Sequence, residues 1–299
     1  MSLTREQFDI LVAYATEDIV NAGSLLEYTP YDTDTIIRVL DELSELKYIS
    51  NSYITRAGFD ALEPYRARRA VLMAAGFGSR LQPVSLKTPK PLVDVNGTRI
   101  IDTLISALYA AGIDEIYVVR GYLAEKFDML TDKYPNINFV HNPIYDKANN
   151  ISSVMYASDL LENAYLLEAD LMLSNPKIIK KYNYCSNFLG IKADSTDDWC
   201  FIVNDDNVID EWKKGGEGAG CYQEVGISYW TEADGAQLRT HVRDSFNAPN
   251  GDEQCWEFPM LIEYRDQYHI EVRECTQDDV VEIDSYEELI QIDDSYLDF

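Results

Sequence analysis

Two nearby segments, 72–83 and 87–92, contain the residues best suited to chemistry, and they read LMAAGFGSRLQP and KTPKPL. Small residues let the backbone approach a base and phosphates closely, and backbone N–H groups can bind anionic oxygens. Arg80 can grip phosphate through two parallel hydrogen bonds, and Lys90, on a proline-stiffened segment, offers a point charge near a phosphorus under attack. The pattern predicts a nucleoside triphosphate site that includes Ala74, Ala75, Gly76, Gly78, Ser79 and Arg80.

Two other phosphate-binding loops are excluded by single positions. A dinucleotide-binding fingerprint needs glycine where Leu81 stands, and a Walker A loop needs Gly-Lys-Ser/Thr where Leu81 and Gln82 stand. A tight turn with surface bases is the simpler alternative. Small residues followed by Gly-x-Gly-x-Arg and then by Pro-Lys-Pro-Leu are more specific than a glycine loop alone, and favour the nucleotide site.

The charge distribution agrees with a local anion site. The chain has 52 acidic and 25 basic residues and a net charge of -27, which should repel nucleic acid, anionic membranes and a free nucleoside triphosphate. The stretch from Arg66 to Arg99 reverses the sign, because it holds seven basic residues and one acid, Asp94. Charge alone does not exclude chance clustering, but the stretch overlaps the glycine loop.

The composition of the 299 residues predicts a folded protein of two domains. No apolar run approaches the roughly 18 residues that span a bilayer, and the first ten residues do not resemble a signal peptide, so we expect a cytoplasmic protein with no membrane partner. Five cysteines without a Cys-x-x-Cys pair indicate free thiols, and three scattered histidines disfavour zinc.

The elements that must position the loop alternate between strands and helices after residue 69. We expect an α/β fold with a Rossmann-like, mixed but mainly parallel sheet in a domain spanning 69–299. In such sheets ligands bind beyond the carboxyl ends of the strands. The expected strands are 69–74, 115–119, 137–140 and 164–167, and the expected helices are 100–111, 123–133 and 151–161.

Residues 1–65 predict a separate small module. Three helices, the third capped by Asp32 or Thr33 and apolar at Ile36, Ile37, Leu40, Leu43 and Leu46, precede a hairpin at 48–55 and a last helix at 57–62. This order resembles a winged helix-turn-helix domain. Between Thr33 and Lys47, however, there are four acidic and two basic residues, and this negative net charge disfavours DNA binding. A structural, dimerising or regulatory role is favoured, and a homo-oligomer is left open.

The glycine loop resembles the signature of the sugar-nucleotide pyrophosphorylase and cytidylyltransferase superfamily, and the resemblance runs from about Arg69 to the end. Within it, the chain is most similar to bacterial choline-phosphate cytidylyltransferases of the Lic type. Four further segments carry the likeness: 119–123 (VRGYL), 149–153 (NNISS), 168–170 (EAD) and 282–285 (EIDS).

The resemblance implies an Mg²⁺-dependent nucleotidyltransferase. It adds Tyr122, Asn150 and Ser153 to the nucleotide site, and it makes Asp170 and Asp284 the metal ligands. Each aspartate also follows an apolar run, which predicts a strand end facing the cleft. Mg²⁺ prefers one or two carboxylates together with phosphate oxygens and water.

For the acceptor, the resemblance points to Trp199, Trp256 and Glu257. Aromatic faces attract a quaternary ammonium, and a carboxylate adds opposite charge, so phosphocholine is the favoured acceptor. 2-Aminoethylphosphonate and phosphoethanolamine are the main alternatives, because Cys255 and Phe258-Pro259 depart from the family's pattern.

The expected reaction transfers CMP from CTP to phosphocholine, with Lys90 stabilising the α-phosphate and Arg80 holding the pyrophosphate. Two other functions remain open: a sugar-1-phosphate nucleotidyltransferase, and a DNA-binding regulator that senses CDP-choline. The sequence leaves cytosine and uracil undistinguished.

Overall fold

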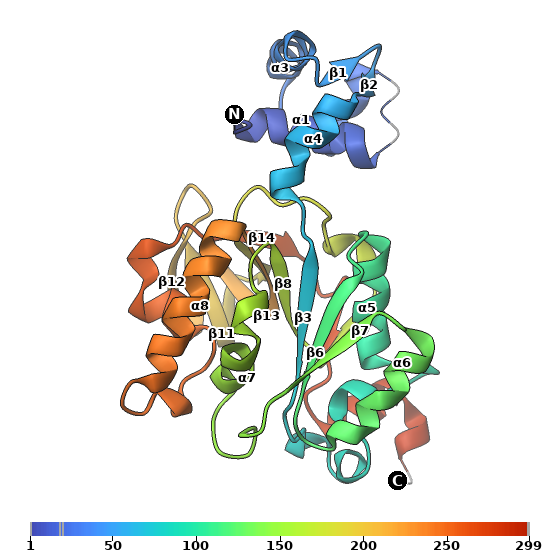
Figure 1. Cartoon of the computed structure of the whole chain (residues 1–299), viewed down its shortest axis with the longest axis vertical. Helices are drawn as coiled ribbons and strands as arrows, with labels where there is room; N and C mark the ends of the chain where they lie inside the picture. The colour runs from blue at the N-terminus through green and yellow to red at the C-terminus, as the bar shows by residue number, and fades with distance from the viewer. Residues whose placement is uncertain (1, 18, 20, 298–299) are drawn as a thin grey trace. The chain divides into compact units, whose positions relative to one another are not determined.

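The computed structural model describes residues 2–17, 19 and 21–297, which form two units (Figure 1). The first is Met1–Arg66 together with Tyr182–Tyr184, and the second is Ala67–Lys181 with Cys185–Phe299. The boundary near residue 66 lies beside the one expected from the sequence. The segment Tyr182–Tyr184 was expected in the second domain, but Tyr182 packs in the apolar core of the first unit.

The first unit contains three helices, a hairpin and a further helix. The elements are α1 (Arg5–Thr16), α2 (Leu25–Tyr28), α3 (Thr33–Glu45), β1 (Ile49–Ser50), β2 (Tyr53–Ile54) and α4 (Arg56–Leu62). Asp32 caps α3, since its carboxylate accepts a hydrogen bond from the Thr35 N–H at 2.9 Å. The elements come in the expected order, while the assignment to the winged-helix class stays a prediction.

The expected apolar face of α3 was wrong in part. Ile36, Val39 and Leu43 are buried, whereas Ile37 and Leu46 are 50% and 39% exposed. The buried residues recur at three and four positions and so share one stripe of the helix, which the two exposed residues flank.

A nine-stranded mixed sheet is the frame of the second unit. Its main path runs β12-β11-β13-β8-β3-β6-β7, and β10 joins β13 to β14. β3 is parallel to β6 and β8, and β6 is parallel to β7, whereas β13 is antiparallel to β8. The strands are β3 (Arg69–Ala74), β6 (Glu115–Arg120), β7 (Ile137–His141), β8 (Ala164–Glu168), β10 (Asn187–Lys192), β11 (Ser195–Val203), β12 (Ile209–Glu217), β13 (Cys221–Trp230) and β14 (Glu271–Cys275).

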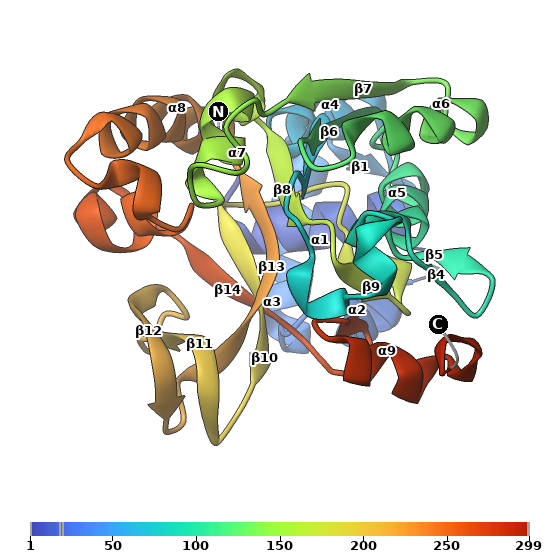
Figure 2. The same ribbon diagram turned by 90° about the horizontal axis from the view of Figure 1, so that it is seen from below.

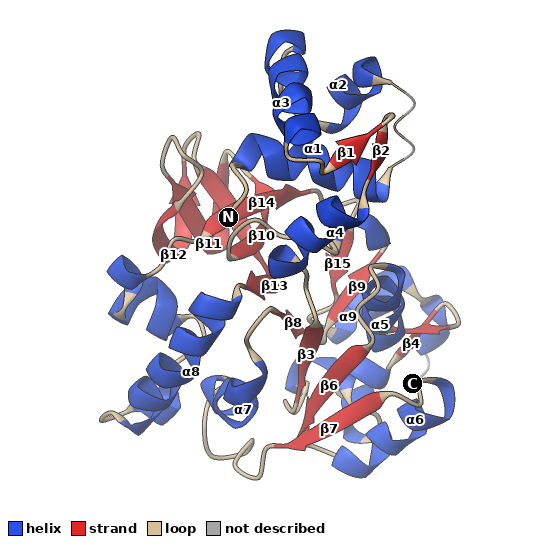
Figure 3. Ribbon diagram, turned by 45° about the horizontal axis from the view of Figure 1, so that its top comes forward, coloured by secondary structure: helices blue, strands red, loops and turns tan. Residues whose placement is uncertain are grey.

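Two small ladders and several helices complete this unit, as Figure 3 shows by colour. The ladders pair β4 (Asp94–Val95) with β5 (Thr98–Arg99), and β9 (Leu171–Leu173) with β15 (Val280–Glu282). The helices are α5 (Ile100–Ala110), α6 (Leu130–Lys133), α7 (Ile151–Ala157), α8 (Glu232–Asn247) and α9 (Tyr286–Ile292). No helix in the described ranges is both long and apolar enough to cross a bilayer.

Alternation along the central strands divides the core into two layers. On β3, Ala70 and Leu72 pack in the cluster that contains α5, while Val71 packs in the cluster that contains α7 and α8. β8 divides in the same way, with Leu167 on the α5 side and Leu166 on the α7 side. Because both faces are covered, the central strands read as continuous apolar runs.

The expected helix at 123–133 was too long. Leu123 has a left-handed φ of 46°, and a 3-10 segment over Ala124–Met129 precedes the short α6. A left-handed residue cannot continue a right-handed helix, so the regular turn begins later.

Candidate functional site

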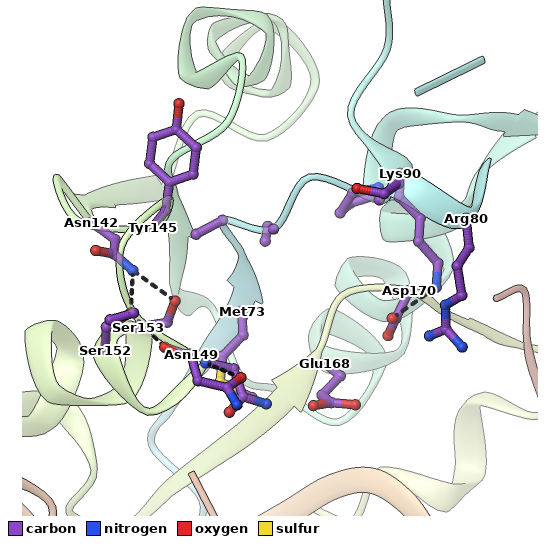
Figure 4. A pocket seen from close by; sticks show the side chains of 18 of the residues that line it. Met73, Arg80, Lys90, Asn142, Tyr145, Asn149, Ser152, Ser153, Glu168 and Asp170 are labelled. Carbon is purple, nitrogen blue, oxygen red and sulfur yellow. Dashed lines mark hydrogen bonds and ion pairs between the residues drawn. The ribbon is translucent and has the colours of Figure 1, made fainter. Parts of the chain in front are cut away.

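A cavity of about 410 Å³ lies beyond the carboxyl ends of β3 and β8. Figure 2 views the molecule from below the view of Figure 1, the side on which β3 ends. Figure 4 shows that the cavity has two sides: Arg80, Lys90 and Asp170 lie on one, and Asn142, Ser152 and Ser153 on the other. The glycine loop contributes Ala74, Ala75, Gly76, Gly78 and Ser79 to the lining.

The glycine loop approaches Lys90 closely. Gly78 has a φ of 58°, which glycine adopts without strain. A Cβ at this position would lie 3.0 Å from the Cβ of Lys90, so the small residue also makes room for the lysine. The carbonyl of Ala75 accepts a hydrogen bond from the Tyr122 N–H at 3.1 Å, which ties the loop to the end of β6.

Lys90 lies between the two aspartates expected to bind metal. Its Nζ is 2.9 Å from Asp170 Oδ2 and 2.9 Å from Asp284 Oδ1, and the lysine is 7% exposed. Arg80 Nη2 also contacts Asp284 Oδ1, at 2.8 Å. Burial works against the charge of Lys90, but the two carboxylates outweigh it and raise its pKa. The lysine therefore stays cationic.

The β9–β15 ladder brings the two aspartates together. β9 follows Asp170 directly, and β15 precedes Asp284, with Glu282 paired to Leu171. The Ile283 N–H continues the contact by donating to the Asp170 carbonyl at 3.4 Å. Backbone pairing of two distant segments thus creates the acidic pair.

Glu282 is a third acidic member that the sequence analysis missed as a ligand. One carboxylate oxygen from each of Asp170, Glu282 and Asp284 lies within 4.8 Å of the others. Loss of hydration around its carboxylate, followed by the charges of the neighbouring aspartates, raises the pKa of Glu282 to about 8, although the residue as a whole is exposed. The signal was present, because Glu-x-Asp occurs at both 168–170 and 282–284.

These three carboxylates fit a hard divalent cation. Mg²⁺ prefers oxygen ligands, and the buried Asp170 Oδ1 has no hydrogen-bond partner among the described residues. An unpaired buried carboxylate oxygen lowers the stability of the folded protein unless a ligand binds to that oxygen.

The opposite side of the cavity carries neutral polar groups. The side-chain amide of Asn142 donates to Ser152 Oγ at 2.9 Å and to Ser153 Oγ at 3.1 Å. Asn150 and Ser153, both expected from the sequence, line the cavity, as does Tyr145. Asn142, Tyr145, Asn149 and Ser152 were not expected. Isolated amides and hydroxyls carry too little sequence signal to be found without a fold.

Four expected residues are absent from the described lining of the cavity: Tyr122, Trp199, Trp256 and Glu257. Tyr122 packs against Phe77, with ring centroids 5.2 Å apart. Trp256 is fully buried, and its backbone N–H donates to Asn150 Oδ1 at 3.0 Å. Glu257 is 6% exposed, and Trp199 is stacked on Trp212. Their roles as ligand-binding residues stay predictions.

Known proteins resemble this chain in sequence and in fold. Residues 69–210 match the family model described as nucleotidyl transferase. The 2-aminoethylphosphonate cytidylyltransferase of Lancefieldella rimae is 35% identical over 231 residues, which are 76% of this chain and 93% of that protein. The choline-phosphate cytidylyltransferase of Haemophilus influenzae is 28% identical over 73% of this chain and 93% of its own length.

A solved structure extends the likeness to three dimensions. The CTP:phosphocholine cytidylyltransferase of Streptococcus pneumoniae superposes with a TM-score of 0.69 at 26% identity, over 76% of this chain and 99% of that one. This chain thus contains the glycine loop, the buried lysine and the sheet that positions them. The relatives named above match it over more than nine tenths of their own length. The chain belongs to the nucleotidyltransferase family.

Proposed function

We propose that the chain is an Mg²⁺-dependent cytidylyltransferase that transfers CMP from CTP to a small molecule bearing an amine and a phosphate or phosphonate. The observation that carries the proposal is the position of Lys90, which is buried against the glycine loop and 2.9 Å from both Asp170 and Asp284. The activities named for the two relatives support the choice of CTP and of an amine-bearing acceptor.

In the proposed reaction, an oxygen of the acceptor's phosphate or phosphonate attacks the α-phosphorus of CTP. A new P–O bond forms, the bond from the α-phosphorus to the bridging oxygen breaks, and pyrophosphate leaves with the electron pair. The acceptor oxygen is already anionic at neutral pH, so no protein base or nucleophile is needed. Alignment and charge stabilisation then supply the catalysis.

Each charged residue has one role in this proposal. Lys90 stabilises the negative charge that develops on the α-phosphate, and Arg80 holds the departing pyrophosphate. N–H groups of the glycine loop bind the phosphates of CTP. Asp170, Asp284 and Glu282 would hold Mg²⁺, which supplies neutralisation of phosphate charge when it is bound.

The neutral side of the cavity is the proposed base site. Asn142, Ser152 and Ser153 offer donors and acceptors there without charge, as a pyrimidine edge requires. The distance across the cavity then separates the base from the cationic side, where the phosphates would bind.

Phosphocholine and 2-aminoethylphosphonate are the two leading acceptors. The sequence favoured phosphocholine because of its tryptophans, and a relative at 35% identity is named for 2-aminoethylphosphonate. Both molecules are small zwitterions whose anionic group would react in the same way.

Pyrophosphate release from the pure protein tests the proposal. The protein is incubated with Mg²⁺, each of the four nucleoside triphosphates, and phosphocholine, phosphoethanolamine, 2-aminoethylphosphonate or glucose-1-phosphate. Turnover with CTP and an amine-bearing acceptor is expected. Turnover only with glucose-1-phosphate, or none with any pair, would refute the proposal.

A further inference from the structure

Three glutamates, Glu168, Glu224 and Glu257, lie close together beside the cavity and outside the catalytic group around Lys90. Glu168 lines the cavity, whereas Glu224 and Glu257, which is 6% exposed, are absent from its described lining and lie near Glu168. In the described part of the chain, no lysine or arginine forms an ion pair with any of the three. Three carboxylates in one place without a cation are unfavourable for the empty protein.

Strand geometry explains why two of these carboxylates meet. Residues 167, 225 and 227 pack in the core layer on the α5 side, so Glu168 and Glu224 project from the opposite face of the neighbouring strands β8 and β13. Gly226 completes the arrangement, because a Cβ there would lie 2.6 Å from Glu168 Oε2. Any larger residue would push Glu168 aside.

Two polar atoms beside these glutamates are buried and unpaired. Trp256 is fully buried, and its indole N–H faces Glu168 without reaching hydrogen-bonding geometry. Trp212 Nε1 donates to Glu224 Oε2 at 2.7 Å and fixes that carboxylate, but Glu224 Oε1 has no partner among the described residues. Buried polar groups are normally satisfied, so the unpaired Oε1 of Glu224 points to a ligand that supplies a hydrogen-bond donor.

The pKa values of Glu224 and Glu257 follow from the same crowding. Burial, followed by the charges of neighbouring acids, raises the pKa of Glu257 well above the ordinary range. Burial raises the pKa of Glu224 to about 7, with Asp198 adding to the effect and the Trp212 N–H opposing it. A bound cation would reverse this effect and favour the ionised forms.

Trp256 and Trp212, the two tryptophans beside the glutamates, do not present open faces as a cage for a quaternary ammonium would. Trp256 has no exposed surface, and its ring is stacked on Phe188 with centroids 5.5 Å apart. Trp212 is covered by Trp199, with ring centroids 4.2 Å apart, and Trp199 is 38% exposed. The recognition groups that remain are carboxylate oxygens, which bind N–H donors.

We infer that Glu168, Glu224 and Glu257 form the amine subsite of the acceptor and that this subsite selects a primary ammonium over a quaternary one. The inference rests on the proposed function. A primary ammonium has three N–H donors for three carboxylates, whereas a trimethylammonium has none and is bulkier. Glu168 precedes Asp170 by two positions, so a short acceptor can reach both the amine subsite and the reaction centre.

A methylation series of acceptors tests the selectivity. Phosphoethanolamine, its N-methyl and N,N-dimethyl derivatives and phosphocholine differ only in the number of N–H donors. With CTP saturating, kcat/KM is expected to fall along the series, by about 10²-fold or more from the first to the last, as when a hydrogen-bonding site meets an analogue that lacks the group. Equal or better use of phosphocholine would overturn the inference.

Glu224→Gln tests the residue assignment, and Glu211→Gln is its matched control. Glu211 is exposed on β12 and pairs with Lys213 at 2.6 Å. Glu224→Gln is expected to lower kcat/KM for phosphoethanolamine more than tenfold and to change that for phosphocholine little, whereas Glu211→Gln leaves both unchanged. The ratio of two acceptors on one preparation is insensitive to partial misfolding. An equal loss for both acceptors would contradict the assignment.

Calorimetric binding separates failure of this inference from failure of the proposed function. If no acceptor is turned over, the proposed function fails, and phosphoethanolamine is then titrated into each protein in the presence of CTP. Binding to the unmodified protein that weakens in Glu224→Gln but not in Glu211→Gln would still support the ammonium subsite. Absence of binding, or equal binding of phosphocholine, would reject it.

Discussion

At the scale of single residues, Lys90 is a cation that the protein desolvates and orients before any substrate arrives. It is 7% exposed and held by two carboxylates at 2.9 Å, which raise its pKa despite burial. A preorganised charge of this kind stabilises a developing anion without the reorganisation that water would require. The same two carboxylates are the candidate metal ligands, so the lysine also screens their repulsion in the empty site.

Lys90→Ala is expected to lower kcat about 10²–10³-fold, the typical effect of removing one preorganised group that stabilises transition-state charge. Lys177→Ala, at an exposed lysine outside the cavity, is the control and should retain full activity. Initial rates of pyrophosphate release at saturating CTP measure the effect. Retention of more than half the activity by Lys90→Ala would show that the assigned role is wrong.

Glu224 should make the empty protein less stable as pH rises. Its folded pKa is about 7, above the ordinary value, because of burial first and Asp198 second. Between pH 4.5 and 7 the unfolded chain therefore binds fewer protons than the folded one, and the free energy of unfolding falls. The loss is nearly complete by about one pH unit above the folded pKa, and it amounts to roughly 3 kcal/mol.

Glu224→Gln should consequently raise Tm by a few degrees at pH 8 and leave it unchanged near pH 4.5. Thermal unfolding at the two pH values, without ligands, measures this difference. Glu211→Gln is again the control, and it should show no gain at pH 8, since an exposed glutamate loses no solvation. A gain of equal size at both pH values would exclude titration of Glu224 as the cause.

At the scale of elements, the conformation of the glycine loop is coupled to the position of Lys90. Gly78 has a positive φ and lies against Lys90, whereas Gly97, in the β4–β5 turn, has a φ of 86° and no neighbour within 4 Å of an added Cβ. The two glycines share the conformational requirement and differ in the contact. They form a matched pair for separating backbone strain from displacement of Lys90.

Gly78→Ala and Gly97→Ala should each lower the free energy of unfolding by about 1 kcal/mol, because alanine is strained at positive φ. Only Gly78→Ala should lose activity, by about 10–100-fold, since its Cβ would move Lys90. Denaturant unfolding and initial rates, measured on the same preparations, separate the two effects. Similar loss of activity in both variants would mean that strain alone governs the site.

At the scale of the whole molecule, the candidate metal site joins distant parts of the chain. Asp170 follows β8 in the middle of the sheet, and Asp284 follows β15 near the C-terminus, with the β9–β15 ladder between them. Anything bound to both carboxylates must therefore be released when this unit unfolds. Binding and global stability are linked for that reason.

Millimolar Mg²⁺ should raise the Tm of the CTP-bound protein by a few degrees, in accordance with RT ln(1 + [L]/Kd). The Asp284→Asn variant should lose most of the Mg²⁺-dependent rise in Tm, and it should still fold. Differential scanning fluorimetry with CTP, with and without Mg²⁺ and with EDTA, provides the measurement. A full Mg²⁺ shift in Asp284→Asn would place the ion on other ligands.

Much of the fold was predictable because its signals are local. The strands at 69–74, 137–141 and 164–168 are short apolar runs bounded by turn residues, and α3 begins after an Asp cap. The prediction of one helix over 123–133 was wrong, because the apolar spacing suits a helix while the backbone at Leu123 has a left-handed conformation. Which residues of α3 are buried also depends on the elements that pack against it, and the sequence of the helix alone does not show these.

The sequence by itself predicted the glycine loop and Lys90 as site residues from residue types at short spacings, and it predicted the two aspartates from the family resemblance and their places after apolar runs. Only the tertiary structure decided which distant groups meet: Glu282 with Asp170, Asn142 with Ser152 and Ser153, and Glu224 beside Glu168. The physical reason is that strand pairing and side-chain alternation set these contacts between segments far apart in the chain. No local pattern records such pairings, and they determine which ligand the site can hold.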